Sequence, residues 1–180
     1  SEFDQNGILL FALASYVDWT GDRSLIGERW SRIERAADFA LEPGFRHDGS
    51  GLLANCREFW ERHGAHGILP GLELTHQLYV SMGLAAAARL AGLVGRQRKA
   101  EKWARAAAAL REAMLGSPRF SLVEDGVFIK RRGVDGAVQR EIVPESGSTL
   151  PREAPLFEPG PHLLDPDTSA VLPVAWEFVD

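Results

Sequence analysis

At 180 residues, with 45% hydrophobic and 25% charged side chains, the chain has the size and composition of one ordinary globular domain. Its 20 basic and 25 acidic residues are spread along the sequence and give a net charge of −5, which argues against nucleic acid as a partner because phosphate binding needs a concentrated basic face. No apolar run approaches the roughly 18 residues of a membrane span, so no membrane association is expected. The lone Cys56 excludes an internal disulfide and leaves the compartment open.

The first predicted elements are two helices of different character. Residues 5–19 carry apolar side chains on nearly every face, which predicts a helix that is buried all round. Gly21 suits the position after a helix end, and Asp22 or Ser24 can cap the helix that follows. From residue 25 to residue 41 the apolar positions recur at spacings of three and four, with charged residues between them. This second helix is therefore expected to be amphipathic and to lie on the outside.

The same pair of helices recurs downstream. Residues 72–94 are again apolar almost all round, Gly95 breaks the pattern, and residues 97–115 are amphipathic. The chain thus contains two predicted helical hairpins, 5–41 and 72–115, each with an inner helix followed by an outer one. Such a repeat predicts an all-α fold, built as a stacked or closed array of hairpins. A four-helix bundle is the alternative, but it would have four similarly amphipathic helices.

Two long connections separate the predicted helices. The connection after each outer helix is long, at residues 42–71 and 116–166, whereas the turn inside each hairpin is short. Loops of that length in a compact domain are usually functional. In an array of hairpins these connections emerge at the same end, together with residues 1–4. We therefore expect one face, formed by these three segments, to carry the site.

The second connection is expected to hold a small β-hairpin. The turn signal Asp125-Gly126 lies between two β-prone runs, and the segment that follows is irregular and rich in Pro and Gly. The basic cluster Lys130-Arg131-Arg132 ends the second run and is interpreted as a solvated strand edge. A third inner helix is expected to begin near Asp167 or Thr168 and to continue through residues 167–180.

Loop 42–71 is the richest in candidate catalytic groups. Glu58, Trp60, Glu61 and Arg62 lie within five residues of one another. An indole beside a carboxyl desolvates it and raises its pKa, as a general acid requires, and the ring can stack on a sugar. Arg62 opposes this effect by favouring the ionised form. A short capped helix with exposed charges is the alternative interpretation.

The histidines give no metal site by themselves. His63 and His66 are three residues apart, but Gly64 between them weakens a helix and no third ligand has a convincing place, so no metal is expected. His76 lies in a predicted buried helix, where a hydrogen-bonded core histidine is expected. The sequence contains no Gly-rich phosphate loop and no nucleophile motif, so no cofactor is expected.

Several of these segments, taken in order, resemble the glucoamylase-like family of six-hairpin glycosidases. The resemblance implies an (α/α)6 toroid that hydrolyses glycosidic bonds, with a carbohydrate as the substrate. It covers most of the chain except about residues 117–160, and it depends on the ordered set of segments more than on any one of them. The matching segments are Phe3-Asp4-Gln5-Asn6-Gly7 with the apolar run 9–13, Thr20-Gly21-Asp22, Gly51-Leu52-Leu53, Glu58-Phe59-Trp60-Glu61-Arg62, residues 83–91, and residues 164–169.

The resemblance assigns roles to individual residues. The Glu after Trp in the family's acidic segment is the general acid, which falls on Glu61, and the acidic residue three before it is a supporting carboxylate, which falls on Glu58. The remaining contacts to sugar would come from Trp60 as an apolar wall and from Arg62, Asp4 and Asp167 as partners of hydroxyl groups. The stretch Gly64–Pro70 lacks the family's aromatic and Thr-rich run, which leaves the sugar open.

Most of the family's ring has no counterpart in these 180 residues. The second carboxylate, which in this family comes from a late hairpin and acts as base, is among the missing parts, so the chain alone is expected to be inactive. The chain begins with Ser1 and ends at Asp180 in mid-pattern, and we expect it to associate with the rest of a parent polypeptide or with further copies. Two alternatives stay open: a non-catalytic module that binds a glycan or a protein, and a toroid lyase or epimerase centred on His63 and His66.

Overall fold

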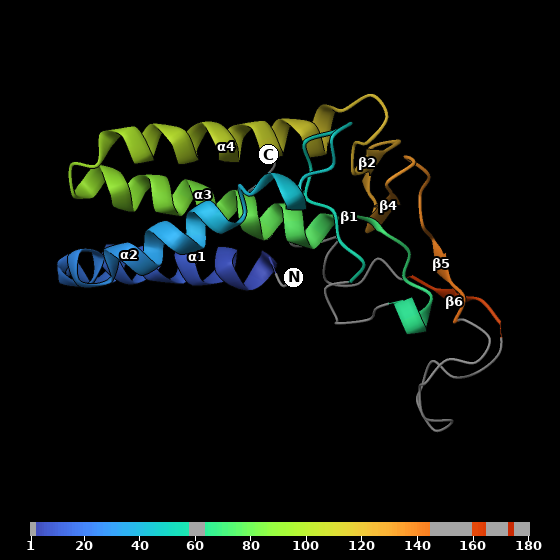
Figure 1. Ribbon diagram of the computed structural model, residues 1–180, viewed down its shortest axis with the longest axis horizontal. Helices are drawn as coiled ribbons and strands as arrows, with labels where there is room; N and C mark the ends of the chain where they lie inside the picture. Colours follow the sequence, from blue (N-terminus) through green and yellow to red (C-terminus); the bar gives the residue numbers. More distant parts are fainter. Residues whose placement is uncertain (1–2, 58–63, 145–159, 165–172, 175–180) are drawn as a thin grey trace, which may run out of the picture.

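The computed structural model describes residues 3–57, 64–144, 160–164 and 173–174, and four helices hold most of this part of the chain. The fold is mainly α, as predicted, and each helix lies within about two residues of its predicted bounds. Short strands occupy the connections at one end of the helices (Figure 1). The helices are α1 (Phe3–Thr20), α2 (Ser24–Phe39), α3 (Leu74–Leu93) and α4 (Gln97–Gly116).

Glycines end the first helix of each hairpin, as the sequence predicts. Gly21 follows α1 with a φ of 71° and Gly95 follows α3 with a φ of 73°, a left-handed conformation that favours glycine. The carboxylate of Asp22 accepts a hydrogen bond of 2.8 Å from the Ser24 backbone N–H at the start of α2. Hydrogen bonds from Ser24 lower the pKa of the Asp22 carboxyl. Both hairpin turns are therefore encoded locally.

The two inner helices, α1 and α3, pack side by side and run in the same direction. Asp4 near the start of α1 lies beside His76 near the start of α3, and Asp18 near the end of α1 pairs with Arg89 further along α3. Their backbones approach most closely at Gly7, where an added Cβ would lie 2.1 Å from the carbonyl oxygen of Tyr79. Only glycine fits this contact.

The outer helices, α2 and α4, are joined by long side chains and run in the same direction, since Arg96 lies over the Trp30 ring and Lys102 pairs with Asp38 further along. Asp38 on α2 accepts hydrogen bonds from Lys99 at 2.8 Å, Lys102 at 2.8 Å and the Trp103 indole at 2.9 Å on α4. Burial raises the pKa of the Asp38 carboxyl, but these hydrogen bonds outweigh it and hold the pKa at about 2. The Trp103 ring lies 5.9 Å from that of Trp30, between centroids. This network joins the two hairpins on the outer side.

The two inner helices differ in burial. Residues on all sides of α3 are buried over most of its length, as predicted, whereas α1 is buried along one side only. The prediction that α1 is buried all round is therefore wrong for the described structure, because α2 and α3 cover one side and leave an apolar side exposed. That side presents Ile8 at 39%, Leu9 at 61%, Tyr16 at 41% and Trp19 at 92% exposure. No described helix is long and apolar enough to cross a membrane.

The strands form three two-stranded antiparallel pairs. The predicted hairpin is confirmed: its strands pair Val123 with Phe128 and Glu124 with Val127, and Asp125 and Gly126 turn with φ of 52° and 77°. The predicted helix at 167–180 lies almost wholly outside the described residues. The pairs are β1 (Gly71–Glu73) with β4 (Arg131–Gly133), β2 (Val123–Glu124) with β3 (Val127–Phe128), and β5 (Glu141–Ile142) with β6 (His162–Leu163); short 3-10 turns occupy Pro43–Phe45 and Gly64–His66.

Candidate functional site

The two long connections meet at one end of the helices. Because α1 and α3 are parallel, their first turns lie together, and the described parts of loop 42–71 and loop 116–166 pack against them (Figure 1). Strand β1 pairs with β4, and Asn55 forms a further antiparallel bridge to Gly71 in β1. The predicted common face, called the loop face below, is therefore present.

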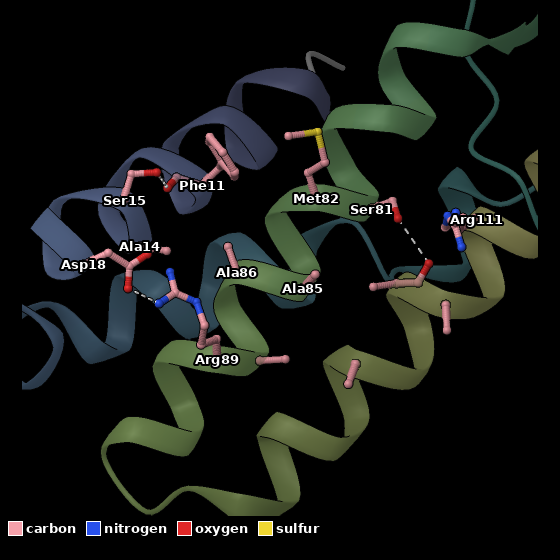
Figure 2. A pocket seen from close by; sticks show the side chains of 14 residues that line it. Phe11, Ala14, Ser15, Asp18, Ser81, Met82, Ala85, Ala86, Arg89 and Arg111 are labelled. Carbon is pink, nitrogen blue, oxygen red and sulfur yellow. Dashed lines mark hydrogen bonds and ion pairs between the residues drawn. The ribbon is translucent and has the colours of Figure 1, made fainter. Parts of the chain in front are cut away.

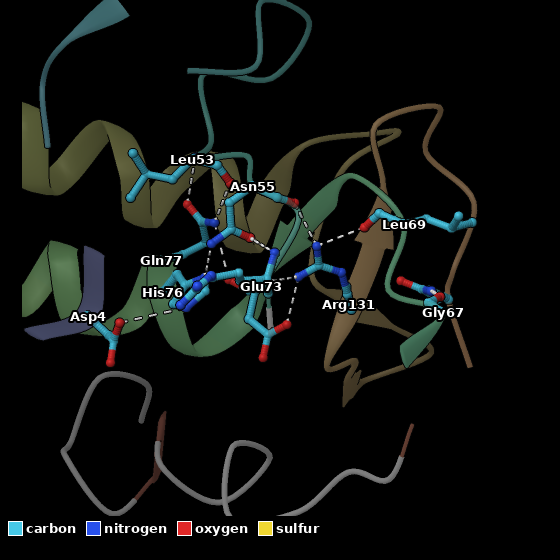
Figure 3. A network of polar contacts seen from close by, with 11 residues as sticks. Asp4, Leu53, Asn55, Gly67, Leu69, Glu73, His76, Gln77 and Arg131 are labelled. Carbon is cyan, nitrogen blue, oxygen red and sulfur yellow. Dashed lines mark hydrogen bonds and ion pairs between the residues drawn. The ribbon is translucent and has the colours of Figure 1, made fainter. Parts of the chain in front are cut away.

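Arg131 lies at the centre of the loop face and is fully buried (Figure 3). Its Nη1 donates to a carboxylate oxygen of Glu73 at 2.9 Å and to the backbone carbonyl of Arg57 at 2.9 Å. Its Nη2 donates to the carbonyls of Asn55 at 2.7 Å and Leu69 at 3.0 Å. One guanidinium thus joins β4, the start of α3 and both arms of loop 42–71.

The basic cluster Lys130-Arg131-Arg132 corrects a prediction. The sequence predicts a solvated strand edge here, but the three residues are only 5%, 0% and 9% exposed. Arg132 donates from Nε to the Ser121 carbonyl at 2.9 Å and from Nη1 to the Gly136 carbonyl at 2.7 Å. The reason is that the loops around the cluster turn their backbone carbonyls inward, and each buried guanidinium satisfies several of them.

A second chain of polar contacts joins α1, α3 and loop 42–71 (Figure 3). The amide nitrogen of Asn55 lies 3.1 Å from Nδ1 of His76, while the Asn55 amide oxygen accepts from the Arg57 backbone N–H at 3.4 Å. Since the Asn55 nitrogen is a donor, Nδ1 of His76 is the acceptor in this contact, and a neutral imidazole then carries its proton on Nε2. That nitrogen lies 3.7 Å from Oδ1 of Asp4. His76 is 4% exposed, so the predicted hydrogen-bonded core histidine is confirmed.

Gln77 fixes the same loop from the next position of α3. Its amide nitrogen donates to the Leu53 carbonyl at 2.8 Å and its amide oxygen accepts from the Leu53 backbone N–H at 2.8 Å. The nitrogen also donates to the Glu73 carbonyl at 3.1 Å. Glu73, His76 and Gln77 therefore form one polar face at the start of an otherwise apolar helix, and each reaches a different part of the loop face.

The structure locates only part of the predicted site. Asp4 is the predicted site residue that is described: it is 9% exposed at the start of α1 and lies beside His76. The predicted residues that lie outside the described part of the chain are Glu58, Trp60, Glu61, Arg62 and Asp167. Arg57 and Gly64, which border the segment holding four of them, belong to the loop face. His66 lies in a 3-10 turn, and no cluster of three or more metal-binding side chains occurs among the described residues.

Sequence reasoning missed Glu73, Asn55, Gln77 and Arg131. A signal for the α3 residues was available: positions 73, 76 and 77 are polar at helical spacing within a predicted buried helix, and buried polar groups need partners. No local signal marks Asn55 or Arg131, because their roles depend on contacts between segments far apart in the sequence.

A groove of about 700 Å³ lies elsewhere, between α1, α3 and α4 (Figure 2). Alanines line much of it, and three polar contacts lie along it: Arg89 pairs with Asp18, Ser81 donates to the Ala107 carbonyl at 3.1 Å, and Ser15 donates to the Phe11 carbonyl at 3.0 Å. The groove follows the helices and does not gather converging polar groups as the loop face does. We therefore place the candidate site at the loop face.

No protein-family model, no curated protein and no solved structure matches the chain.

Proposed function

We propose that the chain supplies two hairpins of an (α/α)6 toroid of the glucoamylase-like kind, which hydrolyses glycosidic bonds at its loop face. The observation that carries the proposal is the parallel packing of the inner helices α1 and α3, with the outer helices α2 and α4 running in the same direction as each other. Helices in an up-and-down bundle pack mainly against antiparallel neighbours. Parallel inner helices and parallel outer helices, joined by short turns at one end and long loops at the other, are what a ring of hairpins requires.

The exposed side of α1 supports the extension of the array. Ile8, Leu9, Tyr16 and Trp19 are all at least 39% exposed on an inner helix. Exposed apolar surface of this kind marks an interface in soluble proteins. Two hairpins do not close a ring, so the proposal includes further hairpins, either in the rest of a parent polypeptide or in further copies.

The proposed mechanism is general acid and base catalysis without a cofactor. Glu61 protonates the glycosidic oxygen, Glu58 supports it, and Trp60 provides the apolar wall. A second carboxylate, outside this chain, activates water on the opposite face of the sugar, which inverting glycosidases accommodate with carboxyl groups roughly 6.5–9.5 Å apart. The side chains proposed to contact sugar hydroxyls are Arg62, Asp4 and Asp167.

Hydrolysis of 4-nitrophenyl glycosides by the native polypeptide tests the proposal. Glu61→Gln removes the proton donor and should lower kcat about 10²–10⁴-fold, the usual contribution of a positioned acid. Glu28→Gln is the control, because Glu28 is exposed on α2 at the opposite end of the helices. Equal activity of the two variants, or no activity towards any glycoside, contradicts the proposal.

A binding module is the second candidate, and a specific feature favours it. A hollow of about 510 Å³ near the loop face is lined by Leu69 and Val143, which are 63% and 58% exposed. Exposed apolar side chains around a hollow suit a protein or glycan ligand. Binding that is lost in Leu69→Ser with Val143→Ser, and is indifferent to Glu61→Gln, would favour this function over catalysis.

A further inference from the structure

Arg131 makes more hydrogen bonds at the loop face than its ion pair with Glu73 requires. It is paired with Glu73, and both side chains are 0% exposed. Removing two charges from water is unfavourable, and their mutual attraction need not offset it, so a buried pair is weak evidence for a purely stabilising role. The remaining bonds go to the backbone carbonyls of Asn55, Arg57 and Leu69, which belong to loop 42–71. These carbonyls carry no charge, so the bonds from Arg131 act mainly by fixing the position of the loop backbone.

We propose that Arg131 is a positioning residue: it holds the backbone at Asn55 so that the polar chain Asn55–His76–Asp4 forms at the loop face. The Asn55 carbonyl receives the shortest of the four Arg131 bonds, at 2.7 Å. The Asn55 backbone also pairs with Gly71 in both directions, at 3.0 and 2.9 Å. Gly71 in turn pairs with Gly133 in the strand that carries Arg131.

The fork of the guanidinium suits this task and an ammonium group does not. Arginine presents donors in a rigid plane, so one side chain can reach carbonyls in two directions while it pairs with a carboxylate. Gly71 leaves room for it: an added Cβ there would lie 3.0 Å from Nε of Arg131 and 2.7 Å from the Arg132 carbonyl oxygen. The site is therefore built for a planar cation.

The position of Asn55 determines which ring nitrogen of a neutral His76 carries the proton. The contact between the Asn55 amide nitrogen and Nδ1 of His76 is 3.1 Å, and a shift of roughly half an ångström would end it as a hydrogen bond. While the contact lasts, a neutral His76 ring has its proton on Nε2, which faces the carboxylate of Asp4. Arg131 thereby sets the hydrogen-bonding edge that His76 presents to Asp4, although it touches neither residue. In the proposed function Asp4 contacts sugar hydroxyls. An effect of Arg131 on those contacts rests on the proposed function, whereas its effect on His76 does not.

Imidazole ¹⁵N chemical shifts of His76 and amide hydrogen exchange at Asn55 and Gly71 test the proposal in the full chain. Arg131→Lys keeps the charge opposite Glu73 but loses the fork. We expect exchange at the two amides to accelerate about tenfold or more, and the His76 shifts to move towards those of Asn55→Ala, which lacks the side-chain partner.

Arg132→Lys is the matched control. Arg132 is also buried and also donates to two carbonyls, but those belong to Ser121 and Gly136 in the other connection. It should lower the melting temperature while leaving the His76 shifts unchanged and the Asn55 exchange within about twofold of the original protein. The proposal is overturned if the His76 shifts in Arg131→Lys equal those of the original protein. It is also overturned if Arg132→Lys changes the His76 shifts as Arg131→Lys does.

Two further measurements keep the test decisive. If Arg131→Lys does not fold, the Nη–H resonances of Arg131 in the original protein are measured instead. Hindered rotation of the guanidinium and slow exchange of its protons are expected. Free rotation and rapid exchange would contradict the proposed positioning role. Titration with maltose separates this proposal from the glycosidase proposal. Altered His76 shifts in Arg131→Lys, together with a native polypeptide that binds and cleaves no glycoside, would uphold the role of Arg131 and overturn the proposed function.

Discussion

Replacing Gly7 by alanine tests how closely the two inner helices approach. The added Cβ would lie 2.1 Å from the carbonyl oxygen of Tyr79, 2.4 Å from its carbonyl carbon and 2.9 Å from the backbone nitrogen of Val80. These are backbone atoms of α3 and cannot rotate away. Carbon and oxygen atoms in contact are normally about 3.3 Å apart or more, so the helices must separate locally by about an ångström.

The expected cost follows from that separation. A gap of 0.5–1 Å forfeits roughly a quarter to a half of the dispersion energy at each contact. The seam beside Gly7 contains buried Leu10, Ala14 and Leu84, and fully burying a large apolar side chain contributes about 1.5–3 kcal/mol. Alanine regains about 1 kcal/mol through its higher helix propensity. Adding the off-rotamer and backbone adjustments of an overpacked core, we expect a net loss of about 3 kcal/mol in the free energy of unfolding.

Thermal unfolding followed by circular dichroism measures this loss. About 3 kcal/mol corresponds to a melting temperature lower by about 6–12 °C for a protein of this size. Gly27→Ala is the control, because Gly27 lies inside α2 with no atom within 4 Å of an added Cβ, and it should raise the melting temperature by about 2 °C through propensity alone. Shifts of the same sign and size in the two variants would refute the close parallel packing of α1 and α3.

Three further predictions concern the outer helices and the β-hairpin. The carboxyl of Asp38 has its pKa lowered from 3.8 to about 2, so its contribution is present above pH 3.8 and is lost as the pH falls towards 2. Because its side chain is 32% exposed, we expect about 1 kcal/mol, seen as a gap between the original protein and Asp38→Asn in urea unfolding at pH 6 that closes near pH 2. Trp103→Ala should cost about 3–5 kcal/mol by the same assay, since the ring is fully buried and its indole N–H is bonded. Gly126→Ala, at a φ of 77° with open space around it, should cost about 1 kcal/mol from backbone strain, and an unchanged urea midpoint would contradict the turn.

The helical part of the fold could be predicted from the sequence because its signals are local. Continuous apolar runs located α1 and α3, apolar spacing located α2 and α4, Gly21 and Gly95 located the turns between them, and Asp125-Gly126 located the hairpin. The exposure of α1 could not be predicted in the same way. Composition shows that a helix is apolar on every side, but which sides are covered depends on which partners are present, and α2 and α3 cover only one side.

The loop face was predictable as a place and not as a set of contacts. Alternating short and long connections indicated which end of the helices would carry the loops, and Asp4 was expected there. The burial of Lys130-Arg131-Arg132 was not foreseen, because three consecutive basic residues are solvated in most sequences. What buries Arg131 is a group of carbonyls from residues 55, 57 and 69, whose convergence depends on the tertiary fold.

The polar chain at the loop face depends on the close backbone contact between Gly7 of α1 and Tyr79 of α3. Asp4 lies one turn before Gly7 on α1, and His76 lies one turn before Tyr79 on α3, so the contact that brings the two backbones together also sets the distance between Asp4 and His76. That distance is already 3.7 Å, and a separation of about an ångström at Gly7 would take the His76 ring and the Asp4 carboxylate out of direct polar contact. A larger residue at Gly7 should therefore weaken the polar chain at the loop face as well as the fold. Pairing the inner helices through glycine is thus a requirement of the site.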